Sequence, residues 1–228
     1  LDGHEGRLMR SLKSLLGSRE NADALVEAMR AADPDFKEHG EHTQLNHYFQ
    51  DGDLESLREG LSPSLPEERR AHFAELLSKA KDYSVRTRQA DAKVIFVMKL
   101  SIDDTTSSNG TARMEFECEV DMPLAELDQI LLDAGFNYQA KWSRNRRSFS
   151  YRDITVTIDR NAGYGYLAEF EAVIEDPSRA DEVKAKLRGL MEELGVEELD
   201  QERLARMFEH YNQNWKDYYG TDKVLTIL

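Results

Sequence analysis

Residues 113–120 alternate charged and apolar side chains without a break. In a β-strand successive side chains point to opposite faces, so Glu115, Glu117 and Glu119 are expected to share one face with Arg113. Carboxylates two residues apart repel one another, and a divalent cation held between them would make the cluster favourable. An ordinary solvated face explains this strand alone more economically, because antiparallel sheets often expose one side to water.

The same alternation recurs on the other predicted strands, and it gathers cations on some strands and carboxylates on others. The expected cations on these faces are Arg86, Arg88, Lys99, Arg113, Arg144 and Arg146, and the expected carboxylates are Glu115, Glu117, Glu119, Asp159, Glu169 and Glu171. A barrel with an apolar outside under helices and an inside of both charges would hold a polyanion together with metal ions. The alternative is an open sheet whose charged side chains form weak cross-strand salt bridges in solvent.

The composition limits the classes of partner. The chain has 228 residues, of which 40% are hydrophobic, so it is long enough for a buried core. Its formal net charge of −14 repels nucleic acid and anionic membranes, so a phosphate ligand must meet a local cluster of cations. The single cysteine, Cys118, argues against disulfide scaffolds and cysteine-ligated zinc. With neither a long hydrophobic run nor a visible secretory signal, a cytoplasmic location is the default expectation.

Hydrophobic periodicity predicts an α+β chain with an internal repeat. Leucines at helical spacing predict a helix over 4–17, so the first half lacks the opening strand that the second half has. Seven strands are therefore expected where eight would close a barrel. The expected strands are 43–49, 83–89, 93–101, 113–120, 138–149, 154–160 and 166–175; the expected helices are 20–32, 123–134 and C-terminal helices over about 178–216, with a helical insertion over about 54–81. The six histidines show no spacing typical of a metal site, and His47 is expected at the rim or the surface.

Several short pieces, in this order and spacing, resemble the CYTH family, also called triphosphate tunnel metalloenzymes. The pieces are 44–49, 84–88, 97–99, 115–117, 144–149 and 158–171. The resemblance covers roughly residues 8–219. It implies a single domain over residues 1–228, folded as an antiparallel eight-stranded β-barrel that is open as a tunnel, with helices packed outside.

The resemblance also implies roles for the charged side chains. The family binds a triphosphate with Lys and Arg and a divalent metal with Glu and Asp. Lys99 and Arg88 would be catalytic. The triphosphate would be bound by Arg86, Arg88, Lys99, Arg113, Arg144 and Arg146, and the cofactor, Mg²⁺ or Mn²⁺, by Glu115, Glu117, Asp159, Glu169 and Glu171.

One departure from the family pattern concerns the opening strand, which usually carries Glu-x-Glu-x-Lys. A helix is predicted at that place here, and Glu119 stands where a lysine would complete a second copy of the pattern. Loss of the strand would remove two metal-binding carboxylates and a lysine. We expect the gap to be filled by residues before Leu1, by another chain, or, as a weaker candidate, by residues 224–228, which lack charged alternation.

The main functional hypothesis is a metal-dependent triphosphatase that acts on inorganic tripolyphosphate or on a small organic triphosphate such as thiamine triphosphate. A class IV-type adenylyl cyclase would use the same tunnel, with a ribose hydroxyl attacking in place of water. A non-catalytic polyphosphate- or nucleotide-binding module is the alternative from another class. The expected partner is a triphosphate-containing small molecule, without DNA or a membrane, and a homodimer is left open.

Overall fold

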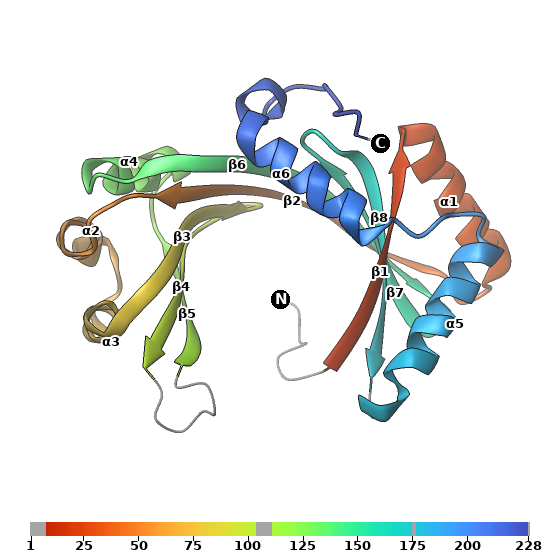
Figure 1. The fold of residues 1–228 in the computed structure, drawn as a ribbon, viewed down its shortest axis with the longest axis horizontal. Coiled ribbons are helices and arrows are strands. Elements are labelled where there is room, and N and C mark those ends of the chain that lie inside the picture. The colour runs from red at the N-terminus through yellow and green to blue at the C-terminus, as the bar shows by residue number, and fades with distance from the viewer. Residues whose placement is uncertain (1–7, 104–110, 175–176, 228) are drawn as a thin grey trace. The chain divides into compact units, whose positions relative to one another are not determined.

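The computed structural model describes residues 8–103, 111–174 and 177–227 (Figure 1). Eight strands form one hydrogen-bonded sheet in the order β1-β8-β7-β6-β2-β3-β4-β5, and every pair with an assigned register is antiparallel. The strands are β1 (Leu8–Gly17), β2 (Lys37–Gln50), β3 (Ala80–Ala90), β4 (Lys93–Asp103), β5 (Thr111–Val120), β6 (Asn137–Tyr151), β7 (Ile154–Asn161) and β8 (Gly165–Ile174). The predicted α+β class with eight antiparallel strands is confirmed. Strands β1 and β5 are the two ends of this order.

The helices follow the predicted pattern with small shifts at their ends. The expected insertion over 54–81 is helical and is broken by a 3₁₀ turn at Pro63, where the missing backbone N–H prevents a continuous helix. The helices of the described chain are α1 (Arg19–Ala32), α2 (Leu54–Leu61), η1 (Ser62–Ser64), α3 (Glu67–Lys79), α4 (Leu124–Asp133), η2 (Pro177–Arg179), α5 (Ala180–Glu193) and α6 (Gln201–Tyr218).

Residues Leu8–Gly17 form strand β1, so the helix predicted over 4–17 is wrong for this stretch. Residues 4–7 lie outside the described residues. Leu12, Ser14 and Leu16 are buried and alternate with partly exposed neighbours, which is a period of two. The leucines fit helical spacing as well, so the local pattern does not distinguish a helix from a strand. Pairing with the distant strand β8, in which Lys13 lies opposite Glu169, favours the strand. The expectation of seven strands and a missing opening strand is therefore wrong.

The C-terminal tail does not take a strand position in the sheet. Val224 forms an isolated parallel bridge with Gly163, and Leu225 N–H donates to the Gly163 carbonyl at 2.8 Å. The tail therefore lies beside the turn between β7 and β8. The predicted gap in the sheet does not exist, because β1 occupies the position of the opening strand.

The chain forms two compact units, each with its own core. Unit 1 comprises Leu1–His42 and Arg144–Leu228, and unit 2 comprises Thr43–Ser143. In unit 2 the apolar positions of β4 and β5 pack under α3, where the rings of Phe73 and Phe116 lie 5.0 Å apart. In unit 1, α1 and α5 lie along the same side of β1 and β8 (Figure 1) and cover a core that includes Phe170. In each unit the helices cover the apolar side of the strands, so the charged alternate positions lie on the other side.

His47 is buried, with 6% of its surface exposed, so its predicted place at the rim or surface is wrong. Its Nδ1 lies 2.7 Å from Oδ2 of Asp128 on α4. The hydroxyls of Thr87 and Tyr138 donate to the same carboxylate at 2.6 and 2.7 Å. Burial raises the pKa of Asp128, but these hydrogen bonds lower it by more, so the pKa lies below its ordinary value. This network fastens α4 to strands β2, β3 and β6.

Asp128→Asn should lower the free energy of unfolding by about 1.5–3 kcal/mol near neutral pH, because hydrogen bonds to a buried charged group are lost. A carboxyl whose folded pKa is depressed stabilises the fold above its unfolded pKa of about 3.9, and that contribution disappears as pH falls through the folded pKa. The difference between wild type and variant should therefore shrink as pH falls below about 4. Urea unfolding at several pH values measures it. Asp133→Asn, at an exposed site on the same helix, is the control and should change stability by less than about 0.5 kcal/mol.

Candidate functional site

Five predicted site residues come together on one face of unit 2, which we call the unit 2 charged face. Its members are Arg86, Arg88, Lys99, Glu115 and Glu117. The register places Lys99 directly opposite Glu115, and the two arginines stand two residues apart on the neighbouring strand β3. This arrangement follows from the strand alternation, because the intervening positions supply the apolar core under the helices.

Two of the three ion pairs of this face are loose. Arg86 Nη2 lies 3.6 Å from Oε1 of Glu115, and Lys99 Nζ lies 3.5 Å from Oε2 of the same carboxylate. Arg88 Nη1 lies 3.1 Å from Oε1 of Glu117. The side chains of the two arginines are only 17% and 18% exposed, whereas those of the two glutamates are 42% and 46% exposed. The two arginines are therefore the desolvated partners, and the two carboxylates are about half exposed.

Arg88 is short of negative charge, and Arg86 is short of a hydrogen-bond acceptor among the described residues. Burial lowers the pKa of Arg88, the positive charge of Arg86 lowers it further, and Glu117 offsets only part of this. The Nε atom of Arg86 is buried and has no hydrogen-bond acceptor within the part of the chain that the structure describes. A buried donor without an acceptor is unfavourable, so an anion bound here would relieve both deficits.

Strand β2 supplies neutral partners for both arginines, and sequence reasoning gave them no role. Tyr48 accepts a hydrogen bond from Arg86 Nη1 at 3.0 Å, and its ring lies 5.7 Å from the guanidinium carbon. Asn46 Oδ1 accepts a hydrogen bond from Arg88 Nε at 3.1 Å. The alternation of Gln44, Asn46 and Tyr48 was the signal that could have placed them on the charged face.

A second group of charged residues forms in unit 1, which we call the unit 1 charged face. It consists of Lys13, Arg144, Arg146, Asp159 and Glu169. Arg146 donates two hydrogen bonds of 2.7 Å to Asp159, and Lys13 Nζ donates to Glu169 at 2.5 Å. Burial raises the pKa of Glu169, but the hydrogen bond and charge of Lys13, together with Ser11 and Arg146, hold it below its ordinary value.

Lys13 was missed because a helix was predicted over its segment. On β1 it shares a face with Ser11, and the position two residues before Ser11 is Met9. If the family's Glu-x-Glu-x-Lys strand is aligned on Lys13, the lysine is present and both glutamate positions hold other residues. The expected loss of the strand is therefore wrong.

The structure gives the strand positions of the remaining predicted residues, and side-chain contacts for some of them. Glu171 lies on β8 opposite Ser11, and its charge acts on Arg146. Glu119 pairs with Lys93 at 3.2 Å rather than with an arginine. Arg113 lies on β5 opposite Ser101, and its side chain lies outside the described residues. Its predicted contact with a triphosphate stays a prediction.

The predicted metal ligands do not form a site made from protein groups alone. Among the described residues no three His, Cys, Asp or Glu side chains are grouped closely enough to hold a metal ion. Glu115 and Glu117 lie on one face of β5. Asp159 and Glu169 both form ion pairs with the guanidinium of Arg146. One or two carboxylates suit Mg²⁺ when substrate phosphates supply further ligands. The donor set therefore fits a metal shared with a phosphate ligand and not a protein-only cage.

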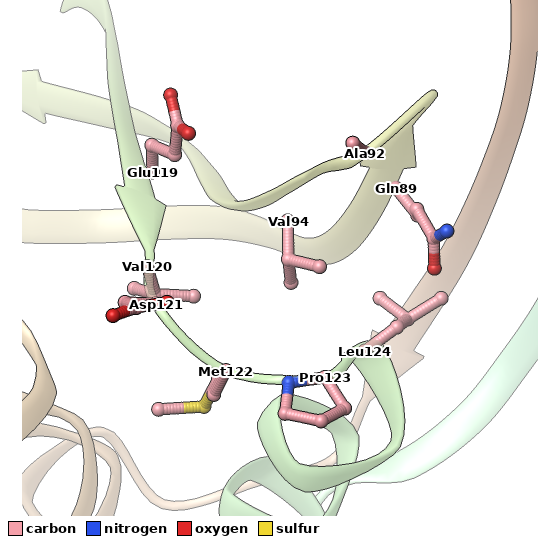
Figure 2. Close-up of a pocket in the computed structure, with 9 residues that line it drawn as sticks. All are labelled: Gln89, Ala92, Val94, Glu119, Val120, Asp121, Met122, Pro123 and Leu124. Carbon is pink, nitrogen blue, oxygen red and sulfur yellow. The ribbon is translucent and has the colours of Figure 1, made fainter.

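A cleft of about 810 Å³ lies in unit 2 at the end of β5 (Figure 2). It is lined by Gln89, Ala92, Val94, Glu119, Val120, Asp121, Met122, Pro123 and Leu124. Two of these nine residues are carboxylates and none is a lysine or arginine. A triphosphate would be repelled there, so the arginines of the unit 2 charged face remain the better anion site.

Within the described residues, no helix is long and apolar enough to cross a membrane.

Solved structures are similar to this chain at low sequence identity. The PH1819 protein from Pyrococcus horikoshii OT3 is 18% identical, with 89% of this chain and 99% of that chain covered and a TM-score of 0.49. A putative adenylate cyclase from Vibrio parahaemolyticus is 14% identical, with 90% and 99% covered and a TM-score of 0.49. The putative adenylyl cyclase HpAC1 from Hippeastrum, described as revealing a dominant triphosphatase activity, is 19% identical, with 89% and 96% covered and a TM-score of 0.45.

Among curated proteins none matches this chain. The CYTH domain matches residues 67–205, which is more than half of the sequence and includes the arginines of β3, the carboxylates of β5 and the charged residues of β6, β7 and β8. The chain therefore belongs to the CYTH family.

Proposed function

We propose that this chain binds the triphosphate group of a small molecule and hydrolyses one of its phosphoanhydride bonds. The observation that carries the proposal is the pair Arg86 and Arg88, which are desolvated and held by neutral groups on β2. Arg88 is short of negative charge, and Nε of Arg86 lacks an acceptor among the described residues. A phosphate chain would accept hydrogen bonds from the planar guanidinium groups, which bind such oxygens by two-point contacts. The family membership and the named activities of other members are consistent with this proposal.

The proposed reaction needs positioning and charge stabilisation more than covalent chemistry. The oxygen of a water molecule attacks the terminal phosphorus, the bond to the bridging oxygen breaks, and negative charge develops on the leaving oxygen. The attacking water releases its proton to the solvent. Arg88 and Lys99 are the catalytic residues in this scheme, because they would face that charge. Arg86 and Arg113, which belong to the same unit as Arg88 and Lys99, would neutralise the remaining phosphate oxygens.

The proposed cofactor is Mg²⁺ or Mn²⁺, carried with the phosphate chain. Glu115 and Glu117, or Asp159, Glu169 and Glu171, would supply its protein ligands, and it would add positive charge next to the phosphate oxygens. On each charged face, carboxylates already form ion pairs with lysine or arginine. A bound phosphate must therefore replace these carboxylates as the partner of the cations.

A second candidate function is triphosphate binding without turnover. The observation that favours it is β1, where Met9 and Ser11 stand at the two glutamate positions of the family pattern. Binding through the arginines would survive this change, whereas hydrolysis would be slow if those two carboxylates are needed. Cyclisation of ATP is a further outcome that the same assays detect.

Arg88→Ala should weaken binding of tripolyphosphate by about 10- to 100-fold, because charge-assisted hydrogen bonds of about 1.5–3 kcal/mol are lost. Calorimetric titration gives the affinity, and phosphate release compared with cyclic nucleotide formation from ATP identifies the reaction. Arg58→Ala removes a partly exposed arginine of the same unit that pairs with Glu55, and it should leave the affinity unchanged. Unchanged affinity in Arg88→Ala would refute the proposed site.

Tripolyphosphate should bind more tightly with Mg²⁺ or Mn²⁺ than with EDTA, because the metal reduces repulsion between the phosphate chain and the carboxylates beside the arginines. Glu115→Gln/Glu117→Gln should reduce the benefit of metal and, in EDTA, should bind at least as well as wild type, since two repelling charges are gone. Calorimetric titrations with and without metal measure both effects. Equal affinity in metal and in EDTA would contradict the metal requirement and leave only an anion site.

A further inference from the structure

Asn46 stands directly opposite Arg88 in the pairing of β2 with β3. Its amide oxygen accepts the Nε–H of Arg88 at 3.1 Å, and its amide nitrogen donates to Gln44 Oε1 at 3.2 Å. A guanidinium carries only donors, so the amide oxygen must face it, and the contact with Gln44 holds the amide in that orientation. The side chain of Asn46 is therefore fixed on both sides.

Two acceptors together determine where the guanidinium of Arg88 lies. Nε is held by the neutral amide of Asn46 and Nη1 by the carboxylate of Glu117. The carboxylate offsets positive charge, whereas the amide orients the group and leaves its charge in place. Arg86 is held in a similar way by the neutral phenol of Tyr48 at 3.0 Å. Neutral partners thus lie on β2, and charged partners lie on β5.

We propose that Asn46 is a positioning residue that holds Arg88 without neutralising it, and that this neutrality sets the affinity of the site for a triphosphate. The inference rests on the proposed function. A carboxylate at position 46 would keep the hydrogen bond to Nε, and would add a negative charge beside both Arg88 and the incoming phosphate. The side chain at this position therefore acts through its charge as well as its shape.

The order of two variants separates this role from a merely structural one. Asn46→Asp retains an acceptor for Arg88 and adds a charge, whereas Asn46→Ala loses the acceptor and adds none. If the neutrality of Asn46 sets the affinity, Asn46→Asp should weaken tripolyphosphate binding by about tenfold or more, and by more than Asn46→Ala does. The reason is that a charge a few ångströms from the phosphates acts strongly in a partly buried site. A structural role predicts the reverse order. In steady-state kinetics the Asp variant should raise KM by a larger factor than it lowers kcat.

Gln89→Glu is the matched control. It makes the same amide-to-carboxylate change on β3, but Gln89 donates to the Asp91 carbonyl and lies on the other side of the strand from Arg88. It should change affinity less than about twofold, since the added charge does not face the bound anion. Gln44→Glu places the charge one alternate position from Asn46 and should have an intermediate effect. If Asn46→Asp does not fold, Gln44→Glu and Gln89→Glu are compared instead. Weaker tripolyphosphate binding by Gln44→Glu than by Gln89→Glu supports the proposal, and equal binding overturns it.

Failure of this inference is distinguishable from failure of the proposed function. If Arg88→Ala weakens tripolyphosphate binding but Asn46→Asp binds as well as or better than Asn46→Ala, the site stands and the role of Asn46 is overturned. If Arg88→Ala binds as tightly as wild type, the site itself is wrong. Thermal unfolding of each variant shows whether it is folded under the conditions of the titration.

Discussion

The two-residue period of the β-strand is the constraint on which the rest of the structure depends. Phe116 is fully buried under the helices of unit 2, so Glu115 and Glu117 are turned to the other face. The same rule on β3 buries Val85 and Thr87 and turns Arg86 and Arg88 toward those glutamates. Burial of one set of side chains thus brings like charges together on the other side. The energy of the core compensates for that repulsion, since each buried aromatic side chain contributes about 1.5–3 kcal/mol.

The two charged faces differ in how completely their charges are paired. In unit 1, Arg146 forms a two-point contact with Asp159, whose side chain is 6% exposed, and Lys13 approaches Glu169 closely. Such a pair holds its geometry and is costly to break. In unit 2 the glutamates are about half exposed and lie at 3.1–3.6 Å from their cations, so their attraction is screened by water. The arginines of unit 2 are therefore easier for an anion to recruit than those of unit 1.

The sequence predicted the parts of this arrangement that depend on local pattern. The faces of β3, β4 and β5 follow from strict alternation, and the helices from caps and apolar spacing. Strand β1 could not be recognised this way, because its leucines satisfy both periods and only pairing with β8 distinguishes them. The burial of His47 was also invisible, since its partner Asp128 is 81 residues away. The contact between Lys13 and Glu169 spans 156 residues and depended on recognising β1 first.

For the proposed function, the net charge of −14 limits the kind of ligand that the arginines would bind. At physiological salt the field of the whole chain decays over about 8 Å, so a long polyanion that extends beyond the site meets repulsion along its length. A short phosphate chain escapes most of that repulsion, because all of its charge lies beside the cations that bind it. Desolvation makes those few contacts strong, as it does for Arg88, and the neutral groups on β2 avoid cancelling them. An acidic protein can therefore bind a small, highly charged anion while repelling nucleic acid, provided that its cations are buried and oriented by uncharged partners.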